Sequence, residues 1–110
     1  MGTVASPATE RRGAPRVPPV AMGWRREALL RPGQPVVLVN ISSAGALVEC
    51  ANRLRPGGLA ELQLAGGERR RRVRGRIERC QVAALNPLRY QGAIVFEDAL
   101  ERGDAATADE

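Results

Sequence analysis

The chain has 110 residues, with 17 basic and 12 acidic side chains and a formal net charge of +5. All 17 basic residues are arginines, and the chain contains neither lysine nor histidine. A chain of this length fits one domain. The missing histidine excludes Ser-His and Cys-His nucleophile pairs and imidazole metal ligands, and two separated cysteines cannot close a zinc site. Composition therefore disfavours an enzyme and favours a protein that binds an anionic or guanine-like ligand through arginine.

The sequence also bears on the compartment. No stretch approaches the roughly 20 apolar residues of a membrane span, and residues 1–10 have no apolar signal core. We therefore expect a cytoplasmic protein with no membrane insertion. Cys50 and Cys80 lie in segments with strand character, and we expect them to be small, buried or half-buried free thiols in a reducing compartment.

Charge and proline content divide the chain into three parts. Residues 97–110 hold six acids and one arginine (net −5), whereas residues 1–96 hold 16 arginines and six acids (net +10). We expect residues 1–9 to be disordered and the proline-rich, basic residues 10–19 to form an extended, flexible arm. The domain, arm included, is expected to cover residues 10–98, followed by a short helix or acidic tail over residues 99–110.

Short apolar runs with turn residues between them follow the arm. Residues 22–30 alternate loosely, and later runs rich in β-branched or alternating apolar residues predict strands. These strands cover residues 36–41, 46–51, 59–64, 69–82 and 89–96, and turns or loops cover residues 31–33, 42–45, 55–58, 65–68 and 83–88. About six short strands without an internal helix predict an all-β fold, a six-stranded antiparallel β-barrel, because closure removes the exposed sheet edges.

The alternation within the predicted strands also indicates which side chains fill the barrel. In one of two registers, one residue apart, the interior is expected to come from Val37, Val39, Ile41, Leu47, Leu62, Leu64, Val73, Ile77, Ile94 and Phe96. Within the arginine-rich residues 69–79, the apolar residues and Gly75 share one parity, and Arg72, Arg74 and Arg76 share the other. That pattern indicates a strand with one solvated face.

Two clusters of residues have binding chemistry. The arm contains Arg12 and Arg16, four residues apart, and a loop after a predicted strand contains Asn40, Ser42 and Gly45 in the pattern NxSxxG. A guanidinium forms bidentate hydrogen bonds with a phosphate or with guanine O6 and N7. The asparagine carbonyl could accept from a guanine N1 or N2 hydrogen, and the serine hydroxyl could contact a base or a phosphate. The glycine is predicted to allow a positive φ and a close backbone approach, so that successive N–H groups can form an anion-binding nest.

An RRxxxR arm followed by [D/N]xSxxG resembles a PilZ domain. In that family the fold is a six-stranded β-barrel, and the two motifs bind the bacterial second messenger cyclic di-GMP. VVLVNISSAGALVE resembles the family's second and third strands, RVRGRIERC its long hairpin strand, and YQGAIVFE its closing strand. The resemblance covers residues 10–98.

The resemblance assigns ligand contacts to residues of both motifs and to a glycine of the last strand: Arg11, Arg12, Arg16, Asn40, Ser42, Gly45 and Gly92. An arginine at the position of Arg11 goes in the family with binding of an intercalated ligand dimer. Asn40 stands where many members have aspartate, so it has no charge to pair with a guanine imide. The sequence departs from the family over residues 22–30, where Trp24 and two arginines replace apolar residues.

Together these features predict a single-domain cyclic di-GMP receptor without catalytic residues, metal or further cofactor. The ligand would clamp the arm onto the barrel, and the changed surface would bind a protein effector in motility, pilus or exopolysaccharide control, with the receptor a monomer or a ligand-linked dimer. One alternative is a PilZ-like module that binds proteins without any nucleotide. The other is a basic nucleic-acid-binding barrel, which the lack of interleaved aromatic residues disfavours.

Overall fold

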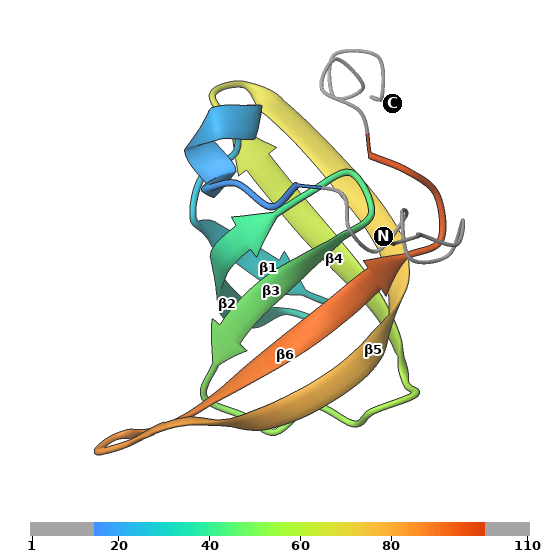
Figure 1. Cartoon of the computed structure of the whole chain (residues 1–110). Coiled ribbons are helices and arrows are strands. Elements are labelled where there is room, and N and C mark those ends of the chain that lie inside the picture. Colours follow the sequence, from blue (N-terminus) through green and yellow to red (C-terminus); the bar gives the residue numbers. More distant parts are fainter. Residues whose placement is uncertain (1–14, 101–110) are drawn as a thin grey trace, which may run out of the picture.

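The computed structural model describes residues 15–100, which form a closed, six-stranded antiparallel barrel (Figure 1). A short 3-10 helix, η1 (Pro19–Met22), precedes the strands. The strands are β1 (Glu27–Leu30), β2 (Gln34–Ile41), β3 (Gly45–Cys50), β4 (Leu59–Gly66), β5 (Arg69–Leu85) and β6 (Leu88–Phe96). They follow one another around the barrel in the order β1-β2-β3-β6-β5-β4, and β4 pairs with β1. The predicted all-β class and six-stranded barrel are confirmed.

Two predicted segments take a different form. Residues 22–30 divide between the end of η1, a short connection and β1, which pairs with both β2 and β4. The loop predicted over residues 83–88 is wrong, because β5 and β6 continue as a paired hairpin until the turn at Asn86 and Pro87. Residues 1–14, and with them Arg11 and Arg12, and residues 101–110 of the predicted tail lie outside the described residues.

Most of the predicted interior is buried, but the prediction is wrong along β2 and β3. Val36 and Leu38 face the core instead of Val37 and Val39. A register shift in the β2–β3 ladder, where Leu38 pairs with Val48 and Asn40 with Leu47, leaves Val39 as an extra residue. Such a β-bulge reverses the alternation of side chains. The side chain of Ile41 therefore returns to the core, whereas Leu47 stays half-buried on the outer face.

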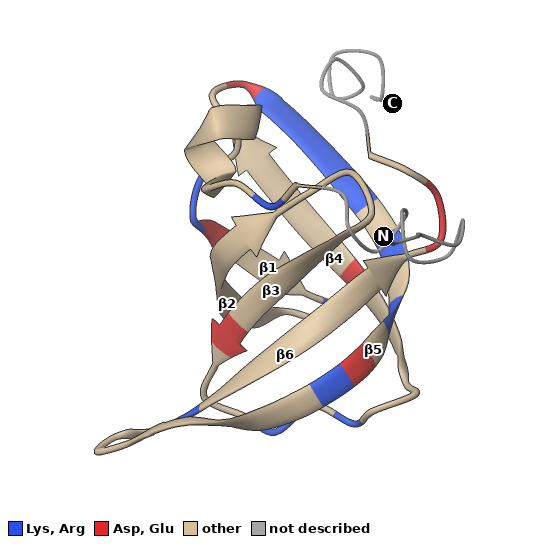
Figure 2. Ribbon diagram, in the orientation of Figure 1, with Lys and Arg blue, Asp and Glu red and all other residues tan. Residues whose placement is uncertain are grey.

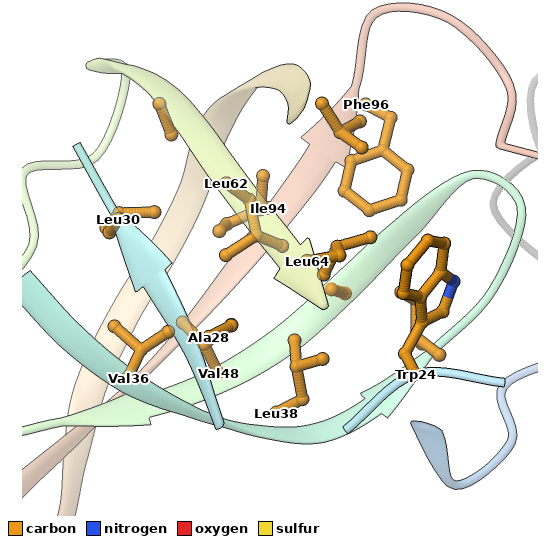
Figure 3. Packing of buried hydrophobic residues seen from close by; sticks show 14 of the residues in the cluster. Trp24, Ala28, Leu30, Val36, Leu38, Val48, Leu62, Leu64, Ile94 and Phe96 are labelled. Carbon is orange, nitrogen blue, oxygen red and sulfur yellow. The ribbon is translucent and has the colours of Figure 1, made fainter. Parts of the chain in front are cut away.

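Trp24 closes one end of the core, next to Leu64 and Phe96 (Figure 3). The guanidinium carbon of Arg69 lies 4.7 Å from the centroid of the indole ring, a cation–π arrangement. The same guanidinium donates a hydrogen bond to the Gly23 carbonyl, at 2.8 Å. Trp24 is therefore a packing residue, and Arg69 ties the start of β5 to the segment that follows η1.

The arginines of β5 follow the predicted alternation. Arg72, Arg74 and Arg76 are exposed, whereas the residues between them are buried. Figure 2 shows the continuous run of arginines at the start of β5, residues 69–72. Arg72 lies 3.8 Å from the Glu61 carboxylate, and Arg76 donates to the Gly57 carbonyl at 2.9 Å. The prediction of a strand with one solvated face is confirmed.

The two cysteines are free thiols, as predicted; Cys50 is buried and Cys80 is half-buried. Burial raises the pKa of the Cys50 thiol, and a hydrogen bond with the Asn52 backbone offsets part of that rise. Cys50 is therefore a protonated, unreactive core residue at neutral pH. Across residues 15–100, no helix combines the length and the apolar character that a membrane crossing requires.

The barrel core predicts a large contrast between two leucines of β4. Leu62 is fully buried, whereas Leu59 is 73% exposed. We expect Leu62→Ala to lower the free energy of unfolding by about 2–5 kcal/mol, because it leaves a cavity in the core. The matched Leu59→Ala should change it by less than about 0.5 kcal/mol. Urea denaturation followed by circular dichroism measures both changes, and similar losses would contradict the placement of these side chains.

Candidate functional site

The end of the arm is attached to the end of β2. Val17 and Ile41 form an antiparallel bridge, with both N–H···O=C hydrogen bonds at 2.9 Å. The Ile41 side chain is fully buried, and Val17 is half-buried against the core cluster. This bridge places the preceding residue, Arg16, beside the outer face of β2.

Arg16 and Asn40, one residue from each predicted motif, contact each other directly. Arg16 Nη1 donates to Asn40 Oδ1 at 3.2 Å, and the bond is solvent-exposed. The two residues are 24 positions apart in the sequence. A guanidinium has five N–H donors, so this bond leaves donors for a ligand. One described residue of each cluster thus lies at the same place on the barrel surface.

Ser42 organises the loop of this site from within. Its side chain is buried, and its hydroxyl oxygen accepts hydrogen bonds from the N–H groups of Ala44, at 3.1 Å, and Gly45, at 3.2 Å. The hydroxyl itself donates to the Gly45 carbonyl, at 3.4 Å. The hydroxyl thus uses its hydrogen-bonding capacity inside the loop, and its predicted contact with a ligand stays a prediction.

The positive φ predicted at Gly45 is wrong, whereas its predicted contact with a ligand stays a prediction. Positive φ values occur at Gly23, Gly33, Gly57 and Gly67 within the described residues, and not at Gly45. Its N–H is also already bonded to the Ser42 hydroxyl. Glycine is needed here for a different reason: a Cβ would collide with the backbone carbonyl of Ile94 on β6. Gly45 thus permits the close pairing of β3 and β6 at the base of the loop.

Gly92 is not brought to this site. It pairs with Val48 and Cys80, three residue pairs along β6 from the partner of Gly45. Its position is buried, and a Cβ there would collide with the side chain of Leu54. Gly92 therefore makes room for packing at the opposite end of the barrel from the loop.

The two remaining predicted contacts, Arg11 and Arg12, lie outside the described residues and stay predictions. Sequence reasoning missed Val17, whose bridge to Ile41 fixes the arm. The available signal was a β-branched residue between Arg16 and two prolines, the one position of the arm suited to pairing with a strand.

A separate hollow of about 770 Å³ shares no residue with the Arg16–Asn40 site. It extends over β1, β2, β4 and the start of β5, and its lining includes Leu29, Pro35, Gln63, Arg70 and Arg89. The contact between Arg16 and Asn40 thus lies outside this hollow. Within residues 15–100, no group of three or more His, Cys, Asp or Glu side chains is placed to hold a metal ion.

Comparisons with known proteins add no further constraint. No protein-family model, curated protein or solved structure matches the chain. The interpretation of the site therefore depends on its own residues and geometry. The contact between Arg16 and Asn40 is the observation that joins the two motifs.

The loop geometry predicts that Ser42 contributes to stability. Ser42→Ala would leave the N–H groups of Ala44 and Gly45 without their acceptor in a partly buried loop, and we expect a loss of about 1–3 kcal/mol in unfolding free energy. Amide hydrogen exchange at these two positions should also accelerate. Ser43→Ala is the control, and it should leave both measurements nearly unchanged. Unchanged exchange in Ser42→Ala would contradict the role of the hydroxyl.

Proposed function

We propose that this chain is a cyclic di-GMP receptor with a PilZ-like barrel. The observation that carries the proposal is the hydrogen bond between Arg16 and Asn40, which joins the arginine arm to the NxSxxG loop. A cyclic dinucleotide has two phosphates and two guanines. A site that combines guanidinium groups with a side-chain amide suits such a ligand.

The two contacting side chains offer different hydrogen-bonding groups to the ligand. The Arg16 guanidinium supplies donors for a phosphate or for guanine O6 and N7, or stacks on the base. The Asn40 amide supplies both a carbonyl acceptor and N–H donors for the edge of a guanine. Because their mutual hydrogen bond is exposed, exchanging it for ligand contacts costs little.

The rest of the motif supports these two residues. Ser42 and Gly45 hold the loop in shape through internal hydrogen bonds and close strand pairing, so Asn40 is presented from a preorganised backbone. The bridge between Val17 and Ile41 fixes one end of the arm. In the proposed mechanism the ligand closes residues 10–16 over the loop, with Arg12 and Arg16 on either side of it.

Such a closure changes the charge and shape of the surface around the loop. In this proposal the changed surface binds another protein, an effector in motility, pilus or exopolysaccharide control. The effector would select the closed arrangement, so that ligand and effector each raise the affinity of the other.

Calorimetric titration with cyclic di-GMP tests the ligand assignment. We expect Arg16→Ala to lose roughly 1–3 kcal/mol of binding free energy, which is a fall of several-fold or more in affinity. Arg31→Ala, in the exposed turn before β2, is the control for a simple loss of positive charge and should bind like the wild type. The assignment fails if the wild type gives no binding heat, in which case a ligand-independent interaction module is the better description.

The stoichiometry of the same titration tests the role of Arg11. If Arg11 recruits the second molecule of an intercalated ligand dimer, the wild type should bind about two ligands per chain, in keeping with what the PilZ resemblance implies. Arg11→Leu should then bind fewer, because it lacks the guanidinium that contacts the second ligand. Sedimentation of the ligand-bound chain shows whether the ligands link two chains. An equal ratio in both proteins would refute this role.

A further inference from the structure

The hairpin of β5 and β6 extends beyond the rest of the barrel. β5 has 17 residues and β6 has nine, whereas β1 has four. Figure 1 shows the paired ends of β5 and β6 projecting away from the other strands, at the opposite end of the molecule from η1. The outer part of this hairpin, residues 81–89, is here called the hairpin tip. One of its faces has no opposing sheet.

The register shows which face is uncovered. Val82 pairs with Tyr90, and Leu85 pairs with Leu88, so all four side chains share one face. Although Val82 and Leu85 are three residues apart, the register shift between Val82 and Ala84 keeps them on the same side. Tyr90 lies on the same face of β6 as the buried Ile94, because the two residues are an even number of positions apart. The apolar face of the hairpin tip thus continues the inner face of the barrel.

The packed interior ends before this face does. The side chain of Leu54 lies over Gly92, and the Leu54 N–H donates to Cys80 Sγ at 3.3 Å. Beyond that point Val82 is 52% exposed, Leu85 72% and Leu88 45%. Exposed hairpin ends are usually made of polar turn residues, so three large aliphatic side chains together at a projecting end need an explanation.

Arginines lie near the base of the hairpin tip, but not all on its apolar face. Arg79 pairs with Ala93 and Arg89 with Ala84, which places both on the face opposite Tyr90. Arg53 and Arg55 flank Leu54 in the loop that closes the barrel, and Arg79 lies on β5 just before the hairpin tip; all three are exposed. Arg89 lies within the tip, where its Nε donates to Glu49 at 3.2 Å. The acidic side chains in this region are Glu49 and Glu78, and Arg79 lies 3.6 Å from Glu78. Figure 2 shows basic and acidic segments at the base of the hairpin and no charged residue at its turn.

We propose that the hairpin tip docks on an anionic lipid surface, with Val82, Leu85 and Leu88 entering the headgroup region and the exposed Arg53 and Arg55 at its base facing lipid phosphates. The apolar face consists of Val82, Leu85, Leu88 and Tyr90, whereas a stable protein interface uses about 20–30 residues from each partner. A lipid interface takes up a small apolar projection without a matching pocket. Positive charge beside that projection strengthens the attraction to anionic headgroups. Such docking needs no membrane-spanning element.

Vesicle co-sedimentation of the full chain tests this proposal. We expect binding to vesicles of phosphatidylcholine with phosphatidylglycerol, much weaker binding to phosphatidylcholine alone, and weakening with added salt. The double variant Leu85→Ser with Leu88→Ser keeps every charge, and its partition coefficient should fall at least about tenfold. Val20→Ser is the matched control, because Val20 is 76% exposed at the other end of the barrel. It should bind like the wild type.

A tryptophan reporter tests whether the tip itself enters the lipid, whatever amount of protein the arginines attract to the vesicles. In Leu85→Trp the new indole should show a blue-shifted emission when the anionic vesicles are added, and in Val20→Trp it should not. Both variants retain the buried Trp24 as the same background. Failure of the wild type to sediment with anionic vesicles would overturn the proposal. Equal sedimentation of the double variant, or an unshifted emission in Leu85→Trp, would overturn it as well, and would leave the tip as a contact for a protein.

Discussion

The β-bulge at Val39 is the constraint on which the candidate site depends. Up to Leu38, alternate side chains of β2 face the core, and continuing that alternation would turn Asn40 inward. The extra residue reverses it, so that Ile41 fills the core and Asn40 lies on the outer face opposite Leu47. With this arrangement Val17 can pair with the backbone of Ile41, and Arg16 can bond to the side chain of Asn40. One irregular position thus connects the core to the site.

The motif residues differ in what the fold requires of them. Ser42 and Gly45 have sufficient structural reasons: the first supplies hydrogen bonds in a buried loop, and the second allows two strands to approach. The fold gives no comparable structural reason for Arg16 and Asn40, since an exposed hydrogen bond between flexible side chains adds little to stability. Residues that the fold does not need are the ones whose presence favours a ligand. The case for binding is therefore strongest at Arg16 and Asn40.

The sequence was sufficient for the parts of the fold that are local. β-Branched runs separated by turn residues predicted the strands and their closure, and alternation predicted the solvated face of β5. It was insufficient where a residue's direction is determined by the strand opposite. Val39 resembles any other valine of its run until its pairing with β3 is known. The segment over residues 83–88 has the composition of a loop, but pairing between β5 and β6 extends the ladder through most of it. The role of Gly45 likewise depends on a carbonyl of β6, nearly 50 positions later.

A closed barrel pairs its strands with one another and so offers little backbone for adding a partner strand. In this molecule the exceptions occur where neighbouring strands differ in length. The β1–β2 ladder ends at the pair of Glu27 and Val37, which leaves the far end of β2 open on that side, and the arm docks there through Val17. At the other end, β5 and β6 continue past their neighbours and expose Leu85 and Leu88. The nucleotide site and the lipid-docking tip that we propose thus have a common structural origin. Both lie where one pair of strands extends beyond the neighbouring pair, and they are at opposite ends of the barrel.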